Sequence, residues 1–147
     1  MAAGLCILHS CCYQVPVIIR DAKTWKEAQS YCRENHNDLI TINSKEEAAV
    51  LGDILRNSAE EFWIGLYSNF YNFRWSMVQE GLDDEGQLEY SNWQPTQPNG
   101  NTENIMCGNM VPSGQWADFL CSLPSPFVCY DGKRTYNHKT SLSSHRK

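Results

Sequence analysis

Seven cysteines are the residues with the most distinctive chemistry in this chain of 147 residues. None of them shows the C-x-x-C spacing of a zinc site, and the last three are widely separated, so the spacing favours disulfides over metal ligation. Disulfides form in oxidising compartments, so we expect the protein to be secreted or to lie on the extracellular face of the plasma membrane. An odd total leaves at least one cysteine free or paired with another chain. The set is Cys6, Cys11, Cys12, Cys32, Cys107, Cys121 and Cys129.

Catalytic motifs are missing from the sequence. It contains no nucleophile elbow, no Gly-rich phosphate loop and no HExxH motif. Three of the four histidines lie near the ends, which leaves His36 alone in the central part and gives little material for a Ser–His or Cys–His pair. The acidic run Asp83, Asp84 and Glu85 is typical of a solvated turn, and a minor metal-binding role is the alternative. We therefore expect a binding protein and not an enzyme.

Composition and length indicate one globular domain. The charged fraction of 20% and the aromatic fraction of 12% are typical of globular proteins. The net charge of −5 argues against nucleic acid as a partner, because nucleic-acid binding needs clustered Lys and Arg. No stretch approaches the roughly 20 apolar residues of a membrane span, so none is expected.

The two ends differ from the middle. Residues 1–12 are expected to be a degenerate signal peptide or an N-terminal extension, since Leu5, Ile7 and Leu8 are apolar but no basic region precedes them. Residues 13–130 are expected to form the domain. Residues 131–147 are polar and basic and are expected to be a disordered, solvated tail.

Two capping boxes predict two helices. Thr24 precedes Glu27 by three residues, and Ser44 precedes Glu47 by three. In such a box the hydroxyl accepts a first-turn N–H, and the glutamate accepts the N–H of the cap residue. The helices are predicted at residues 25–35 and 45–56. Apolar side chains share one face of each, namely Trp25, Ala28 and Cys32 in the first and Ala48, Leu51 and Leu55 in the second.

Short apolar runs predict the strands. A β-branched run at residues 15–19 and a continuous apolar run at residues 62–66 have strand length. Further strands are predicted at residues 106–111, 115–117 and 127–130, with a turn at residues 112–114. Residues 67–100 are rich in Asn, Gly, Asp and Pro and predict a long irregular loop, a feature that in compact domains is usually functional or mobile.

The order of these features resembles the C-type lectin fold over about residues 13–130. Residues 63–66 look like the family's WIGL core motif, residues 97–99 (Gln-Pro-Asn) like its sugar-specifying tripeptide, and residues 116–118 like its W-N-D triplet with one substitution. The pattern is also similar to the lectin modules of fish mannose-receptor-like proteins. The positions that match the core motifs are Trp63, Ile64, Gly65, Leu66 and Trp116.

The resemblance implies an α+β fold, with two helices against short antiparallel sheets, a long irregular binding loop and two intradomain disulfides. The family pairs the outer two and the inner two of its four cysteines, here Cys32–Cys129 and Cys107–Cys121. The outer bridge would close nearly the whole domain, which stabilises by about 4–5 kcal/mol in the chain-entropy model. The inner bridge would close a shorter loop and stabilise the fold by about 3 kcal/mol in the same model.

The resemblance also implies a site for calcium and carbohydrate. In family members that bind sugars, the same side-chain oxygens ligate Ca²⁺ and hydrogen-bond two sugar hydroxyls, on either side of a cis-proline. Gln at the first position of the tripeptide is the galactose-type residue and Asn at the third is the mannose-type residue, so specificity stays open. An aromatic ring nearby either stacks on a sugar or anchors the loop. The residues implied for the ion are Gln97, Asn99, Glu103 and Asp118, and those implied for the sugar are the same four and Trp93.

Two residues depart from the family pattern. Ala117 replaces the Asn of the triplet and has no side-chain oxygen, and Ile105 stands where a glutamate often lies. Glu103, two residues upstream, is the expected substitute. The first hypothesis is therefore an extracellular lectin domain that binds glycans or glycoproteins, with Ca²⁺ at a degenerate site. The second is a calcium-independent lectin-like module that binds a protein receptor.

Overall fold

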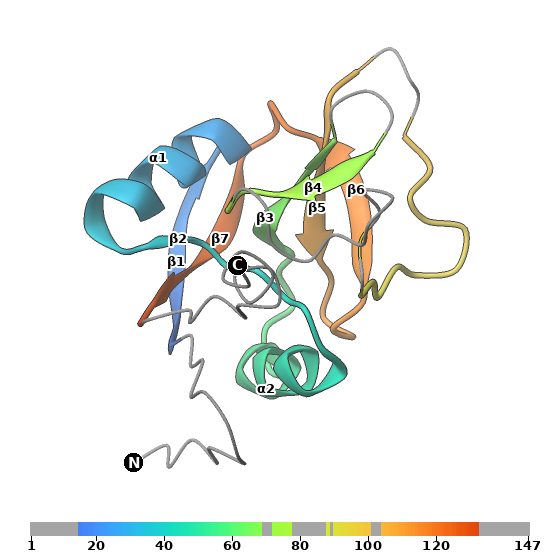
Figure 1. Ribbon diagram of the computed structural model, residues 1–147, viewed down its shortest axis with the longest axis horizontal. Helices are drawn as coiled ribbons and strands as arrows, with labels where there is room; N and C mark the ends of the chain where they lie inside the picture. Colours follow the sequence, from blue (N-terminus) through green and yellow to red (C-terminus); the bar gives the residue numbers. More distant parts are fainter. Residues whose placement is uncertain (1–14, 69–71, 78–87, 89, 101–103, 133–147) are drawn as a thin grey trace, which may run out of the picture.

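The computed structural model describes residues 15–68, 72–77, 88, 90–100 and 104–132. The predictions for residues 1–12, for the tail from residue 133 onward, for the acidic run at residues 83–85 and for Glu103 lie outside these residues. Figure 1 shows helix α1 beside strands β1 and β7, helix α2 below the sheet, and the segment of residues 90–100 on the β6 side.

Both helices begin where their caps predict. Helix α1 (Trp25–Asn35) has a complete capping box, in which Thr24 Oγ1 accepts the Glu27 N–H at 3.3 Å and Glu27 Oε2 accepts the Thr24 N–H at 3.0 Å. Helix α2 (Lys45–Leu55) begins after Ser44, whose Oγ accepts the Glu47 N–H at 3.1 Å. The Glu47 carboxylate accepts the N–H of Asn43 at 2.7 Å, one residue earlier than a capping box requires.

In the described part of the chain, seven strands form one mixed sheet. They are β1 (Val15–Lys23), β2 (Asp38–Leu39), β3 (Phe62–Ser68), β4 (Phe73–Trp75), β5 (Met106–Met110), β6 (Trp116–Leu120) and β7 (Ser125–Asp131). The main path runs β1-β7-β3-β5-β6, with β2 paired to β7 and β4 paired to β3. The pairs are antiparallel except β3 with β7. The short strands β2 and β4 were not predicted, and β4 lies inside the segment predicted to be irregular.

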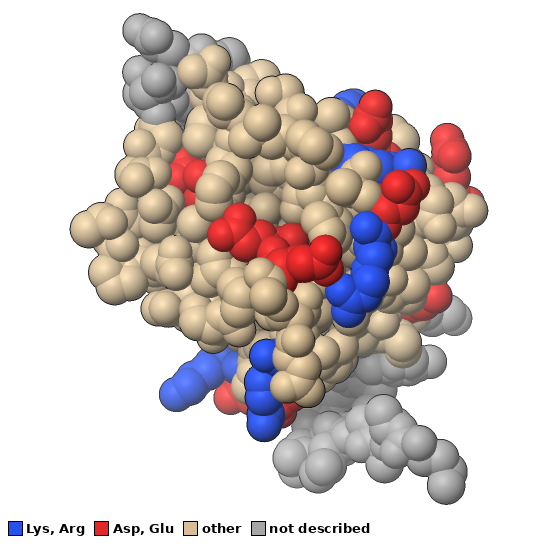
Figure 2. Space-filling model, turned by 180° about the vertical axis from the view of Figure 1, so that it is seen from behind, with Lys and Arg blue, Asp and Glu red and all other residues tan. Residues whose placement is uncertain are grey.

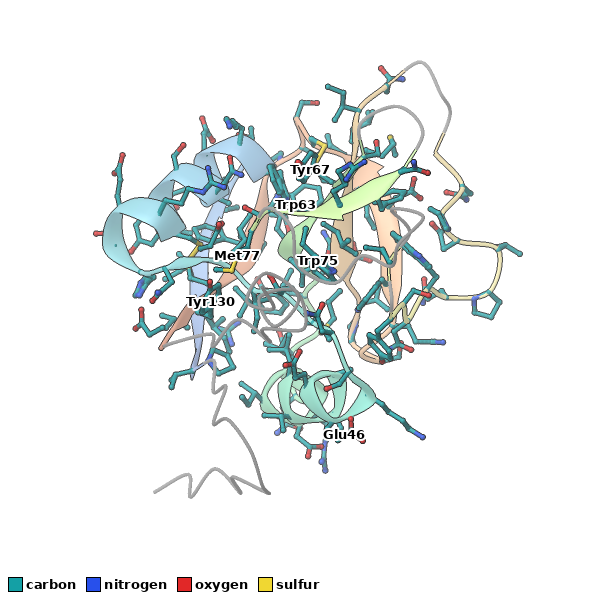
Figure 3. All side chains as sticks on the ribbon, in the orientation of Figure 1. Glu46, Trp63, Tyr67, Trp75, Met77 and Tyr130 are labelled. Atoms are coloured by element: carbon teal, nitrogen blue, oxygen red, sulfur yellow. A yellow bond between two sulfur atoms is a disulfide. The ribbon has the colours of Figure 1, made fainter. Side chains whose placement is uncertain are left out.

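The WIGL segment fills the core from both faces of β3. Because successive side chains of a strand point to opposite faces, Ile64 and Leu66 belong to the cluster that packs on α2, and Trp63 belongs to the cluster on α1. The Trp63 indole donates to the carbonyl of Lys23 at 3.0 Å, and Figure 3 labels Trp63 and Tyr67 of the same strand. At Gly65, a Cβ would lie 2.9 Å from the carbonyl oxygen of Ile40, so only glycine fits. The predicted core positions are confirmed as buried.

A buried polar network ties α1 to the segment that follows β4. Ser76 Oγ donates to Asp38 Oδ1 at 2.6 Å and accepts the side-chain amide of Gln29 at 2.9 Å. Arg33 donates through Nε to the other oxygen of Asp38 at 3.3 Å and through a terminal nitrogen to the Ser76 carbonyl at 3.0 Å. Next to this network, the Tyr130 hydroxyl contacts the sulfur of Met77 at 3.4 Å (Figure 3). The polar atoms of this network thus position the start of the long loop.

The two expected disulfides are present. Cys32 of α1 bonds Cys129 of β7 across 97 residues, and Cys107 of β5 bonds Cys121, just after β6, across 14 residues. The α+β fold with two helices and two intradomain disulfides is therefore confirmed. Within the described ranges, neither helix has the length and apolar character needed to cross a membrane.

Candidate functional site

The loop around the tripeptide rests on a cluster of aromatic rings. Trp116 of β6 is buried and lies edge-to-face with Trp75, Tyr90 and Trp93, with ring centroids 5.5, 5.8 and 5.7 Å apart. Trp93 also packs against Phe73 of β4, at 4.7 Å. Such pairs add about 0.5–1.5 kcal/mol beyond the area that they bury. Trp93 therefore has the contacts of a residue that anchors the loop.

The backbone of residues 92–94 runs along the outer edge of β6. The Trp116 N–H donates to the carbonyl of Asn92, and the Gln94 N–H donates to the carbonyl of Trp116, both at 2.8 Å. Trp93 and Trp116 form a parallel β-bridge. Since β6 is the last strand of the main path of the sheet, this segment covers an edge that would otherwise expose unpaired backbone groups.

A tight reversal follows. The Gln97 N–H donates to the carbonyl of Gln94 at 3.0 Å, and Thr96 has a φ of +68°. The bond between Gln97 and Pro98 is cis, as the resemblance implies. The reversal turns the chain back toward β6.

The structure brings Gln97, Asn99 and Asp118 close together. Asp118 is only 6% exposed. Its Oδ1 accepts the backbone N–H of Asn99 at 2.9 Å, and its Oδ2 accepts the backbone N–H of Gly100 at 2.8 Å. In return, the Asp118 N–H donates to Oε1 of Gln97 at 3.3 Å. The side chain of Asn99 belongs to an exposed residue of this loop.

Gly100 is a site residue that the sequence analysis missed. A Cβ at this position would overlap both Oδ2 of Asp118 and the side chain of Met106. Glycine suits this position because a side chain here would require the Asp118 carboxylate or the Met106 side chain to shift. The signal was present in the sequence, since the glycine directly follows the tripeptide.

The two departures from the family pattern lie on either side of this site. Ala117 is buried, pairs with Asn109 of β5, and points to the face of β6 opposite Asp118. Ile105 is 49% exposed just before β5. Neither residue brings a side-chain oxygen to the loop.

The described side chains do not fit a calcium ion. Ca²⁺ takes six to eight oxygens, and the described residues of the predicted set are Gln97, Asn99 and Asp118. Together these three side chains offer four oxygens, and three of the four, both of Asp118 and Oε1 of Gln97, also accept a backbone N–H group. Within the described part of the chain, no group of three or more His, Cys, Asp or Glu side chains is placed to hold a metal.

A concave surface lies between α2, the turn after β5, and Tyr90 and Asn92. Its volume is about 410 Å³, and none of the predicted site residues lines it. Tyr90 lies at its rim, where burial, and then the negative charge of Glu46 on α2, raise the pKa of the phenol above its ordinary value of 10.0 (Figure 3 labels Glu46). The residues that line it are Lys45, Ala48, Ala49, Gly52, Asp53, Arg56, Tyr90, Asn92, Pro112, Ser113 and Gly114.

On the face of the molecule that lies behind the view of Figure 1, the charged side chains form small groups. Figure 2 shows lysine and arginine in separate places, mostly beside acidic side chains, on a surface that is largely uncharged. Arg20 pairs with Glu60 at 2.7 Å, and Lys23 pairs with Asp21 at 3.3 Å. Exposed pairs of this kind contribute little to stability.

Comparison with known proteins assigns the fold to a family. The family model of the lectin C-type domain matches residues 21–131. Rat (Rattus norvegicus) E-selectin is 32% identical over 127 residues, which are 83% of this chain and 22% of E-selectin. The chain thus spans about a fifth of the length of the E-selectins that it matches.

Solved structures agree with this assignment. The cow C-type carbohydrate-recognition domain of CD23, solved in the presence of a GlcNAc2Man3 oligosaccharide, is 31% identical with a TM-score of 0.67, over 84% of this chain and 89% of that chain. A calcium-independent type II antifreeze protein shares the fold at 24% identity and a TM-score of 0.66, over 86% of this chain and 90% of that chain. The chain belongs to the C-type lectin domain family, whose members are binding modules and not enzymes.

Proposed function

We propose that this domain is an extracellular lectin that binds carbohydrate at the loop of residues 97–99. The observation that carries the proposal is the meeting of the tripeptide with Asp118, which leaves the side chain of Asn99 exposed beside the edge of β6. The CD23 domain, a relative at 31% identity that was solved in the presence of an oligosaccharide, supports the ligand class. The two disulfides support an oxidising, extracellular location.

The residues proposed to bind the sugar are those that the sequence predicts. Asn99 offers both a donor and an acceptor to sugar hydroxyls. Because an N–H of Asp118 faces Oε1 of Gln97, the NH₂ group of Gln97 points elsewhere and is available to donate to a ligand. Glu103, from outside the described residues, and Trp93 complete the proposed set. Whether the ligand is of the galactose or the mannose type is a question for the experiment.

A glycan array tests the proposal. The domain is applied in about 5 mM Ca²⁺, above the range of typical extracellular sites, and again in EDTA, and the best glycan is then titrated by calorimetry. We expect Asn99→Ala to weaken binding about tenfold or more, because it removes hydrogen bonds to the ligand. Asn57→Ala is the matched control, since Asn57 is exposed just after α2. If no glycan binds in either buffer, the proposal is wrong.

A calcium-independent module that binds a protein receptor is the second candidate function. Ile105, Leu120 and Leu123 are 49%, 40% and 48% exposed. The Cys107–Cys121 bridge brings their segments together, because Cys121 Sγ lies 3.3 Å from the carbonyl oxygen of Ile105 and the Leu123 N–H donates to the Leu120 carbonyl at 3.1 Å. A panel of extracellular receptor domains tests it. Leu123→Ser should abolish an EDTA-resistant interaction that Val50→Ser, at an exposed position on α2, leaves intact.

A further inference from the structure

We propose that Asp118 is the anion that holds the loop of residues 97–100 in its binding conformation, so that the loop is ordered without calcium. The inference concerns loop order, and its bearing on carbohydrate rests on the proposed function. It starts from the observation that both oxygens of Asp118 and Oε1 of Gln97, which belong to the predicted ion shell, accept backbone N–H groups.

The loop is fastened to the edge of β6 at two residues, Trp116 and Asp118. Residues 92–94 pair with the backbone of Trp116, two residues before Asp118. The Asp118 N–H then meets the side chain of Gln97, and the Asp118 carboxylate meets the N–H groups of Asn99 and Gly100. The side chain of Gln97 therefore supplies the acceptor that a neighbouring strand would supply at an inner position of a sheet.

Two successive N–H groups that converge on one point form a concave site for an anion. Here a residue of the same chain provides the anion. Hydrogen bonds from N–H groups to an ionised carboxylate are roughly twice as strong as neutral ones, and burial of Asp118 at 6% exposure limits competition from water. Asp118 thereby ties the loop to β6 in the way that an ion shared between the two would.

Gly100 makes this contact possible. With no Cβ, its backbone N–H reaches 2.8 Å from Oδ2 of Asp118 while Met106 packs on the other side. A Cβ at this position would overlap the Asp118 carboxylate in its present place, so a larger residue is expected to strain this contact. The pair of Gly100 and Asp118 is therefore the structural requirement for a loop that is ordered by the protein alone.

Amide hydrogen exchange, followed by NMR on the whole chain, tests the inference directly. In EDTA, exchange at the Asn99 and Gly100 amides is expected to be slowed about tenfold or more relative to Asp118→Asn, and about 5 mM Ca²⁺ should leave the wild-type rates unchanged. Asp131→Asn is the matched control, because Asp131 is a half-exposed aspartate that pairs with His36. It should leave these two rates unchanged.

Two results would overturn the inference. One is fast exchange at both amides in EDTA with protection only after Ca²⁺ is added, and the other is unchanged protection in Asp118→Asn. If Asp118→Asn does not fold, Gly100→Ala is used in its place, because it displaces the loop and keeps the carboxylate. Faster exchange at the Asn99 amide is then expected in EDTA, and unchanged exchange would overturn the inference. Glycan binding is not part of this readout, so protected amides in a domain that binds no glycan would contradict the proposed function and leave this inference supported.

Discussion

The backbone N–H of Gly100 lies 2.8 Å from Oδ2 of Asp118, and a Cβ at Gly100 would overlap this carboxylate. This contact joins residues 18 positions apart and places the loop that carries the tripeptide against the last strand of the main path of the sheet. The candidate site is therefore a rigid edge of the domain that is built from one strand and one loop.

Gly100→Ala should destabilise the domain and displace the loop. The added methyl would overlap the Asp118 carboxylate and Met106, and overpacking of this kind typically costs about 1–3 kcal/mol. Thermal unfolding measures the change. Gly52→Ala is the matched control on α2, where a Cβ meets nothing within 4 Å, and it should stabilise by about 0.5–1 kcal/mol. Equal effects of the two substitutions would contradict the steric argument.

Trp93→Ala should lower the free energy of unfolding by about 2–4 kcal/mol, since it removes ring contacts with both Phe73 and Trp116. Trp93→Phe should restore most of the loss, because a smaller ring still packs edge-to-face. Urea unfolding checks both variants. A Trp93→Ala domain with normal stability and no glycan binding would instead identify Trp93 as a residue that stacks on the sugar.

Ser76→Ala should lower the free energy of unfolding by about 1–3 kcal/mol. The substitution removes the acceptor of the Gln29 side-chain amide and a donor to the buried Asp38 carboxylate. The loss should appear in denaturant unfolding at neutral pH. Ser113→Ala, at an exposed turn, is the control and should change stability little. If Ser76→Ala leaves the free energy of unfolding unchanged, water or a neighbouring side chain replaces the hydroxyl in its hydrogen bonds.

The outer disulfide should stabilise the fold more than the inner one. It closes 97 residues against 14, which corresponds to about 4–5 and about 3 kcal/mol in the chain-entropy model. Calorimetry on the Cys32→Ala/Cys129→Ala and Cys107→Ala/Cys121→Ala double variants compares them. The reverse order of melting temperatures would show that native-state packing outweighs loop entropy.

Tyr90 should make the domain less stable in alkali. Burial and the charge of Glu46 raise its pKa above 10.0, so near that pH the unfolded chain loses the phenolic proton while the folded chain retains it. The contribution of protonated Tyr90 to the free energy of unfolding is fully present below pH 10.0. It is lost as the pH rises through the pKa of Tyr90 in the folded state. Stability measured against pH should show this loss in the wild type and not in Tyr90→Phe. Glu46→Gln should lower the pKa of Tyr90 partway, since burial is the larger cause.

Features that depend on neighbours within one turn of the chain were predictable from the sequence alone. The capping box of Thr24 and Glu27 places the start of α1, and the apolar spacing of Trp25, Ala28 and Cys32 selects its buried face. The order of the motifs, with the cysteine positions, was sufficient to indicate the fold class and both disulfides through resemblance. The grouping of the tripeptide with Asp118 was implied by the resemblance and not by any local pattern of the chain.

Only the tertiary structure decided how that meeting is made. The strands β2 and β4 are too short to have a pattern of their own and exist because β7 and β3 offer partners. The Asp118 carboxylate accepts two N–H groups, and Gln97 turns its oxygen toward β6, because a tight reversal brings residues about 20 positions apart within hydrogen-bond distance. A carboxylate in the sequence is an available acceptor, and the donors that reach it depend on the folded path of the chain.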